Sequence, residues 1–173
     1  MSFVGMCEQL ARNGVRFVVV GGVAAIAQGS ARDTHDLDIC YEPEEQNLAR
    51  LVRLLMAWKA RLRVPDGSGA SLPLMIDART FRDSHLLTLE TDLGLIDLMD
   101  CVAGVGDFAT VWAKSEAVAL GPVEVRVLTL DALIASKRAV GRRQDREHLI
   151  ELEAIRAIKQ FAEKESATRR RRR

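Results

Sequence analysis

The chain has 173 residues, of which 48% are apolar, and a formal net charge of +1 at pH 7. This length and composition fit one domain with a buried core, or a small domain with a helical appendage. No apolar run approaches the length of a membrane span, and the N-terminus lacks the basic start and apolar core of a signal peptide. Three scattered cysteines suggest neither a disulfide framework nor a zinc site, so we expect a cytoplasmic protein.

Charge is distributed unevenly along the chain. Arg169–Arg173 contribute five positive charges to the net of +1, so the preceding 168 residues sum to −4. The body therefore lacks the overall basic character of nucleic-acid-binding domains. Binding to RNA would need a local patch or the arginine tail, whose affinity for a phosphate backbone would fall steeply with salt. The alternative for this tail is a solubilising role.

The first elements predict a site for an anion. Residues 2–14 have the apolar spacing of an amphipathic helix that stops at Asn13-Gly14. The apolar, β-branched run Phe17–Val20 predicts a buried strand, and it ends at Gly21-Gly22. The glycine pair allows a tight turn whose N–H groups approach a ligand, and Val23–Ala27 can open a helix whose N-terminus attracts a phosphate.

A second short strand carries two carboxylates. Asp36 and Asp38 alternate with Leu37 and Ile39, so the acids share one face while the apolar side chains enter the core. Neighbouring carboxylates repel each other and are costly to keep ionised without a cation. Mg²⁺ suits them because it takes oxygen ligands and binds through one or two carboxylates together with substrate phosphates. A phosphate cradle beside an acidic metal site indicates phosphoryl or nucleotidyl transfer.

The middle of the chain predicts a helix and a β-hairpin. Residues 43–61 carry a core-facing apolar stripe at helical spacing, and a turn-rich loop at 65–69 follows. Residues 85–90 and 95–99 predict two strands joined by a turn. Asp97 interrupts the second strand, where a charge is costly unless it is paired or metal-bound. Asp97 is therefore a candidate third metal ligand; the alternative is a solvent-facing acid at the strand end, which Asp100 fits better.

The remaining elements are mostly helical. Residues 108–115 predict a short helix, residues 117–120 and 123–127 predict two strands, and Thr129 can cap a helix over 130–140 that Gly141 ends. A last helix is expected over 144–162. We expect residues 163–173 to be a disordered basic tail, because they are charged and terminal and have no apolar face. The expected fold is α/β (α+β): a small mixed sheet with packed helices in residues 1–128, followed by C-terminal helices in residues 129–162.

In the order and spacing of its motifs the chain resembles the nucleotidyltransferase superfamily, which has the polymerase-β-like fold. That family's motif is an apolar residue, Gly, then Gly or Ser, and after a spacer an Asp-x-Asp strand. Here it reads Val20-Gly21-Gly22, thirteen spacer residues and Asp36-Leu37-Asp38. The form Arg32-x-Thr34-x-Asp36-x-Asp38 is similar to the toxin-type members, the bacterial abortive-infection and tRNA-modifying toxins. Ile96-Asp97-Leu98 matches the setting of the family's third metal carboxylate.

The resemblance also implies roles for residues near the C-terminus. Toxin-type members have a helix bearing a Lys, then a basic loop, then an Asp that opens the next helix, and Lys137, Arg142 and Asp145 occupy those positions. Lys137 would supply a mobile positive charge for a triphosphate. Arg142 would donate paired hydrogen bonds from its planar guanidinium to phosphate oxygens. Asp145 could hold this basic group or simply cap the helix. An ordinary solvated surface is the alternative for both basic residues.

Residues before the Asp strand are further nucleotide-binding candidates. Ser30 would cradle the β and γ phosphates together with Gly21 and Gly22. Arg32 could touch the outer phosphates or pair with a carboxylate of the body. Thr34 would share the face of Asp36, and in the resembled toxins a Ser or Thr here can be phosphorylated by a cognate antitoxin, which would repel the nucleotide.

The resemblance implies an enzyme that moves NMP from an NTP such as ATP to an acceptor and releases pyrophosphate. Asp36 and Asp38 would hold two Mg²⁺ ions (or Mn²⁺), Asp97 would bind one of them and could accept the proton of the attacking oxygen, and Lys137 would neutralise the leaving group. RNA, at a tRNA 3′ end, is the implied acceptor, and the protein would be a toxin neutralised by an antitoxin. The alternatives are transfer to a protein or to a small molecule such as an antibiotic, and a non-catalytic nucleotide-binding partner or antitoxin subunit.

Overall fold

The structure, a computed structural model, describes residues 3–64, 71–73, 77, 80–81, 84–141 and 145–171. The predicted turn-rich loop at 65–69 lies outside the described residues. In chain order the elements are α1 (Phe3–Arg12), β1 (Phe17–Val19), α2 (Gly21–Ala27), β2 (Asp36–Tyr41), α3 (Glu45–Ala57), β3 (Arg61–Arg63), β4 (Ser71–Pro73), β5 (Leu86–Thr91), β6 (Gly94–Met99), β7 (Cys101–Val102), β8 (Gly106–Asp107), α5 (Phe108–Ala113), β9 (Ser115–Leu120), β10 (Val123–Leu128), α6 (Leu130–Val140) and α7 (Asp145–Arg171).

A mixed sheet organises the fold, as the sequence predicted. Its strand order is β4-β3-β5-β6-β2-β1-β10-β9, so the two strands with candidate acids, β2 and β6, are neighbours near its centre. These two strands run parallel, and Asp38 stands opposite Asp97 in their register. The β5–β6 hairpin and the β9–β10 pair are antiparallel, as expected from their short turns.

The sheet has eight strands and is therefore larger than the small sheet that the sequence predicted. The difference arises partly at β3, where the sequence predicted that a helix continues to residue 61. Instead α3 ends at Ala57, and Lys59 adopts a left-handed φ of +51°. The N–H groups of Lys59 and Ala60 donate to the carbonyls of Met56 and Leu55, which closes the helix end and releases the next residues to form a strand.

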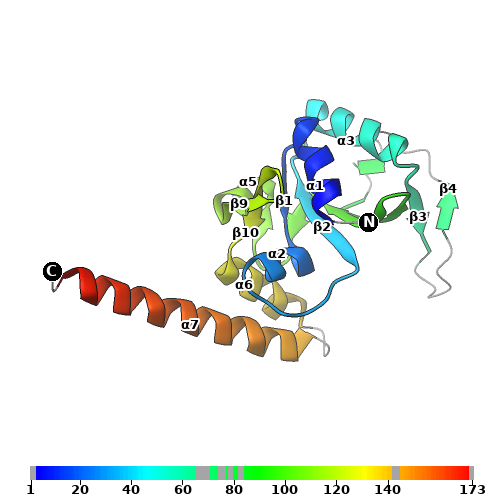
Figure 1. The fold of residues 1–173 in the computed structure, drawn as a ribbon. Helices are drawn as coiled ribbons and strands as arrows, with labels where there is room; N and C mark the ends of the chain where they lie inside the picture. The colour runs from blue at the N-terminus through cyan, green and yellow to red at the C-terminus, as the bar shows by residue number, and fades with distance from the viewer. Residues whose placement is uncertain are drawn as a thin grey trace.

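The core lies against the central strands. Leu37, Ile39, Ile96 and Leu98 are fully buried, and they alternate along β2 and β6 with the acidic positions. In Figure 1, α1 and α3 lie at the top of the view and α2, α6 and the start of α7 at the bottom, with the strands between them. The alternation therefore directs apolar side chains into the core and leaves the carboxylates for a separate surface.

Helix α7 is longer than the sequence predicted. It continues to Arg171, whereas we expected disorder from residue 163. The additional residues are mostly Ala, Glu, Lys and Arg, which favour helices even where nothing packs on them. Its first half packs on α6 and the body, and its second half extends away from the rest of the chain (Figure 1). Within the described residues no helix combines the length and the apolar character needed to cross a membrane.

Candidate active site

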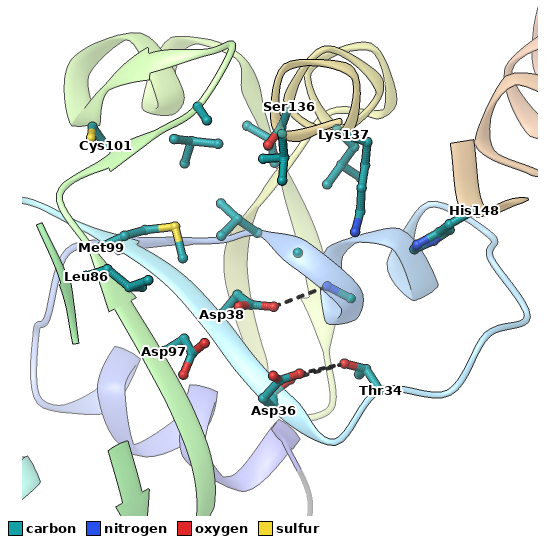
Figure 2. Close-up of a pocket in the computed structure, with 18 of the residues that line it drawn as sticks. Thr34, Asp36, Asp38, Leu86, Asp97, Met99, Cys101, Ser136, Lys137 and His148 are labelled. Carbon is teal, nitrogen blue, oxygen red and sulfur yellow. Dashed lines mark hydrogen bonds between the residues drawn. The ribbon is translucent and has the colours of Figure 1, made fainter. Parts of the chain in front are cut away.

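Three carboxylates from two strands converge at one point. Asp36 and Asp38 project from β2 and Asp97 from the neighbouring strand β6 (Figure 2). Each offers an oxygen, and these oxygens all lie within 4.8 Å of one another. Because side chains two apart on a strand share a face, and the parallel register aligns Asp38 with Asp97, the sheet itself fixes this cluster.

The glycine pair at the start of α2 brings main chain against these acids. Gly21 has a left-handed φ of +59°, and a Cβ atom there would lie 1.9 Å from Oδ2 of Asp38. The Gly22 N–H donates to the same oxygen at 3.3 Å. A Cβ on Gly22 would lie 2.4 Å from the hydroxyl of Thr34. Both positions therefore require glycine because the chain passes too close to the site for any side chain.

Burial and mutual repulsion raise the proton affinity of the cluster. Burial first, and then the carboxylates of Asp36 and Asp97, raise the pKa of Asp38 to about 7, although the Gly22 N–H and Lys137 act in the opposite direction. Burial and the Asp36 carboxylate likewise raise the pKa of Asp97. Carboxylates arranged in this way are unfavourable as free anions and favourable as ligands of a cation.

The donor set fits a divalent metal ion with oxygen ligands. The Oδ1 atom of Asp97 is buried and makes no hydrogen bond among the described residues, so a lone-pair site remains for a cation. Thr34 donates a hydrogen bond of 3.0 Å to Oδ1 of Asp36, which orients that carboxylate. Among the described residues the cluster offers three carboxylates and no nitrogen or sulfur ligand, which matches the preference of Mg²⁺ or Mn²⁺.

The acids line a cavity of about 700 Å³ that also includes the glycine turn. Lys137 enters it from α6 and His148 from α7, opposite the carboxylates (Figure 2). The electrostatic effect of Lys137 on Asp38 indicates that the two charges interact. Apolar side chains cover another part of the wall: Leu86, Met99, Val102, Leu133 and Val140. The cavity thus combines an acidic cluster, a cation and an apolar surface.

No protein-family model and no curated protein matches the sequence. Solved structures do match the fold. The lincosamide antibiotic adenylyltransferase LnuA superposes with a TM-score of 0.58 at 12% identity, over 87% of this chain and 94% of its own. ANT(2″)-Ia, determined with adenylyl-2″-tobramycin, has a TM-score of 0.56 at 16% identity and 98% coverage of both chains. A Thermotoga maritima protein assigned as a nucleotidyltransferase has a TM-score of 0.53 at 18% identity, over 85% and 87% of the two chains.

The chain has the nucleotidyltransferase fold. Identities of 12–18% establish this fold alone, and the local geometry must support any activity. The nucleotidyltransferase fold here carries its three acids on β2 and β6, next to the glycine turn, as the sequence motifs predicted.

Two of the predicted nucleotide-binding residues contact α7. Ser30 does not line the cavity, and its hydroxyl donates to Oε1 of Glu151 at 2.9 Å. Arg32 does line the cavity, but its guanidinium bonds to Glu151 and Glu147 at 3.1 and 3.2 Å. Ser30 thus helps to attach α7 to the body. Arg32 borders the cavity and pairs with carboxylates, which is one of the two alternatives that the sequence left open for it. Arg142 lies outside the described residues.

Asp145 begins α7, as predicted, although its side chain is not among those described. His148 is a cavity residue that sequence reasoning missed, since no metal-ligand spacing marks it. The apolar residues Leu86 and Met99 were also missed as cavity residues, because strand alternation alone does not reveal which exposed face borders a site. These residues reach the cavity only through tertiary packing, for which a single sequence carries no local signal.

We expect Gly21→Ala to disrupt the site and destabilise the protein. The left-handed backbone alone costs roughly 1–2 kcal/mol for a residue with a Cβ atom, and the new methyl group would clash with Asp38. Gly5→Ala is the control, because nothing lies within 4 Å of a Cβ there and α1 would gain helix propensity. Urea unfolding measures both variants. A Gly21→Ala protein with the wild-type midpoint would contradict the close approach of main chain and carboxylate.

Proposed function

We propose that the chain is a Mg²⁺-dependent nucleotidyltransferase of the cytoplasm that moves NMP from an NTP to an RNA acceptor. The convergence of Asp36, Asp38 and Asp97 beside the glycine turn carries this proposal, because a degenerate binding subunit would have no need to keep three mutually repelling acids. The proposed biological role is the toxin of a toxin–antitoxin pair, with a tRNA 3′ end as acceptor. The Arg32-x-Thr34-x-Asp36-x-Asp38 motif supports this role by its resemblance to toxin-type members.

In the proposed reaction, an acceptor hydroxyl attacks the α-phosphorus of the NTP. A new O–P bond forms, the bond between the α-phosphorus and its bridging oxygen breaks, and pyrophosphate leaves. Mg²⁺ bound by the three carboxylates would supply Lewis acidity at the phosphates. Asp97, whose pKa is raised, takes up the proton of the attacking hydroxyl. Lys137 neutralises charge that develops on the leaving group. Gly21 and Gly22 keep side chains away from the phosphates.

The test of this proposal follows a labelled nucleotide. The protein is incubated with each α-labelled NTP, Mg²⁺ and total RNA, and then with protein or small molecules in place of RNA. We expect label in RNA with the native chain and none with Asp36→Ala. Asp131→Ala, which alters an exposed acid on α6, is the control and should retain transfer. If no acceptor shows labelling that is lost in Asp36→Ala, the enzymatic proposal is refuted.

A second acceptor class is favoured by one observation. A smaller cavity of about 420 Å³ adjoins the first, shares His85 and Cys101 with it, and has acids in its wall: Glu42, Glu44, Asp100 and Asp107. No Lys or Arg is among the described residues that line it. This acidic surface suits a cationic small molecule better than an RNA backbone. ANT(2″)-Ia, whose structure holds an adenylylated tobramycin, has the same fold.

Transfer to an amine-rich antibiotic is therefore the second candidate. For such an acceptor Glu44→Gln should raise the KM for the acceptor several-fold and leave the KM for the NTP unchanged, because the lost charge lies in the second cavity. The same variant should leave RNA labelling unchanged or improve it, since an anionic acceptor gains nothing from Glu44. The two assays together decide between the acceptor classes.

A further inference from the structure

Helix α7 carries an apolar stripe on the side opposite the one that packs on the body. Leu152 is fully buried and His148 is nearly so, and these residues mark the packed side. Ile150 and Phe161 are 68% and 66% exposed, and Ala154 and Ala157 between them are also exposed. The spacing of these four residues is four, three and four, which places them in one line along a helix. Ile158, 69% exposed, widens this line at its middle.

The stripe of Ile150, Ala154, Ala157 and Phe161 is symmetric about its centre. Read from either end it presents a large residue, two alanines and a large residue. Two identical helices placed antiparallel about this centre would set Ile150 opposite Phe161 and Ala154 opposite Ala157. The small alanines allow the helix axes to approach closely, and the larger side chains fill the space at both ends. A self-complementary surface of this kind is the requirement of a two-fold dimer.

The charges that flank the stripe are symmetric about the same centre but opposite in sign. In the antiparallel register Arg146 stands opposite Glu165, and Glu147 stands opposite Lys164. All four residues are exposed in the chain. The two-fold axis repeats both of these contacts at the other end of the dimer. Four contacts between opposite charges would therefore flank the apolar centre. An unrelated partner would not require this inverted order of charges.

The body of the protein leaves room for this arrangement. The hydrogen bonds that Ser30 donates to Glu151 and that Lys159 donates to Gln28 attach the other side of α7 to the body. At the edge of the stripe, Glu147 pairs with Arg32 of the body, and both side chains are partly exposed. The second half of α7 extends beyond the rest of the chain (Figure 1). Residues 145–166 form a helical segment about 33 Å long at 1.5 Å per residue, which gives several turns of contact.

We propose that α7 is a dimerisation helix whose stripe of Ile150, Ala154, Ala157 and Phe161 packs antiparallel against the same stripe of a second copy of this chain. The two bodies then lie on the outer sides of the helix pair. This inference does not depend on the nucleotidyltransferase activity, because none of the four residues lines the cavity.

The test is the mass of the full chain in solution, measured by sedimentation over a range of concentrations. We expect a dimer of the 19.1 kDa chain. Ala157→Glu should weaken it by about 100-fold or more, because carboxylates would be buried at the centre without partners. Gln160→Glu, on the same helix but off the stripe, should leave the dissociation constant within about threefold of wild type. Circular dichroism would verify that both variants keep their helices.

Exchange of the flanking charges tests the register. Arg146→Glu and Glu165→Arg should each weaken the dimer several-fold, and the double variant should regain wild-type affinity, since opposite charges again face each other. A chain that is monomeric at all concentrations refutes the proposal, even if another protein binds the stripe. A dimer that Ala157→Glu leaves intact, or a double variant weaker than both single ones, also refutes it.

Discussion

Asp97→Asn is expected to lower the rate of nucleotidyl transfer by about 10³-fold. The substitution removes one of the three carboxylates that we propose hold the metal, and it removes the proposed proton acceptor of the reaction. Asparagine has nearly the same shape, so the β6 strand and its pairing with β2 should persist. Removal of one charge also relieves the repulsion felt by Asp38. The variant should therefore be at least as stable as wild type, and its loss of activity cannot be attributed to unfolding.

The matched control for this experiment is Asp92→Asn. Asp92 lies in the turn of the same β5–β6 hairpin, is exposed, and contacts Lys59 and Arg61 away from the cavity. Its substitution should leave transfer within about twofold of wild type, as for most exposed ion pairs. Steady-state rates with the preferred NTP and acceptor provide the measurement. If Asp97→Asn keeps a tenth or more of the wild-type rate, the role assigned to Asp97 is wrong.

The central part of the site could be predicted from the sequence because its cause is local. Asp36 and Asp38 are two residues apart on a strand, so their common face follows from strand geometry alone. Asp97 could be found because a charge stands within an apolar strand. The pairing of β2 with β6, which brings Asp97 opposite Asp38, has no local signal. The family resemblance supplied only the expectation that Asp97 joins the other two acids in one metal site.

Other residues could not be placed because their environment depends on distant parts of the chain. Ser30 lies close in sequence to the acidic motif, yet its partner is Glu151, which is 121 residues away. Proximity along the chain was misleading here because α7 returns to cover this loop. His148 reaches the cavity from α7 for the same reason. The end of α3 was missed because Lys59 adopts a left-handed conformation that the sequence would assign to glycine.

The second large effect concerns stability and its dependence on pH. In the folded chain the pKa of Asp38 is raised from 3.8 to about 7, first by burial and then by Asp36 and Asp97. The folded state therefore binds this proton more tightly than the unfolded state. The corresponding stability is fully present below about pH 4 and is lost as pH rises through about 7. A shift of this size changes the free energy of unfolding by an amount of the order of 4 kcal/mol between low and high pH.

Asp38→Asn should accordingly stabilise the metal-free protein at about pH 8.5, where wild-type Asp38 is ionised, and should have little effect near pH 4. Urea unfolding in the presence of EDTA measures this difference, and Asp92→Asn, an exposed acid, should show no comparable gain. Mg²⁺ should then stabilise wild type at high pH, because a cation offsets the repulsion among the three acids, and should stabilise Asp38→Asn much less. Equal unfolding midpoints for wild type and Asp38→Asn at high pH without metal would show that the cluster is not strained. In that case the three carboxylates would not repel one another strongly, and this argument for a metal site would fail.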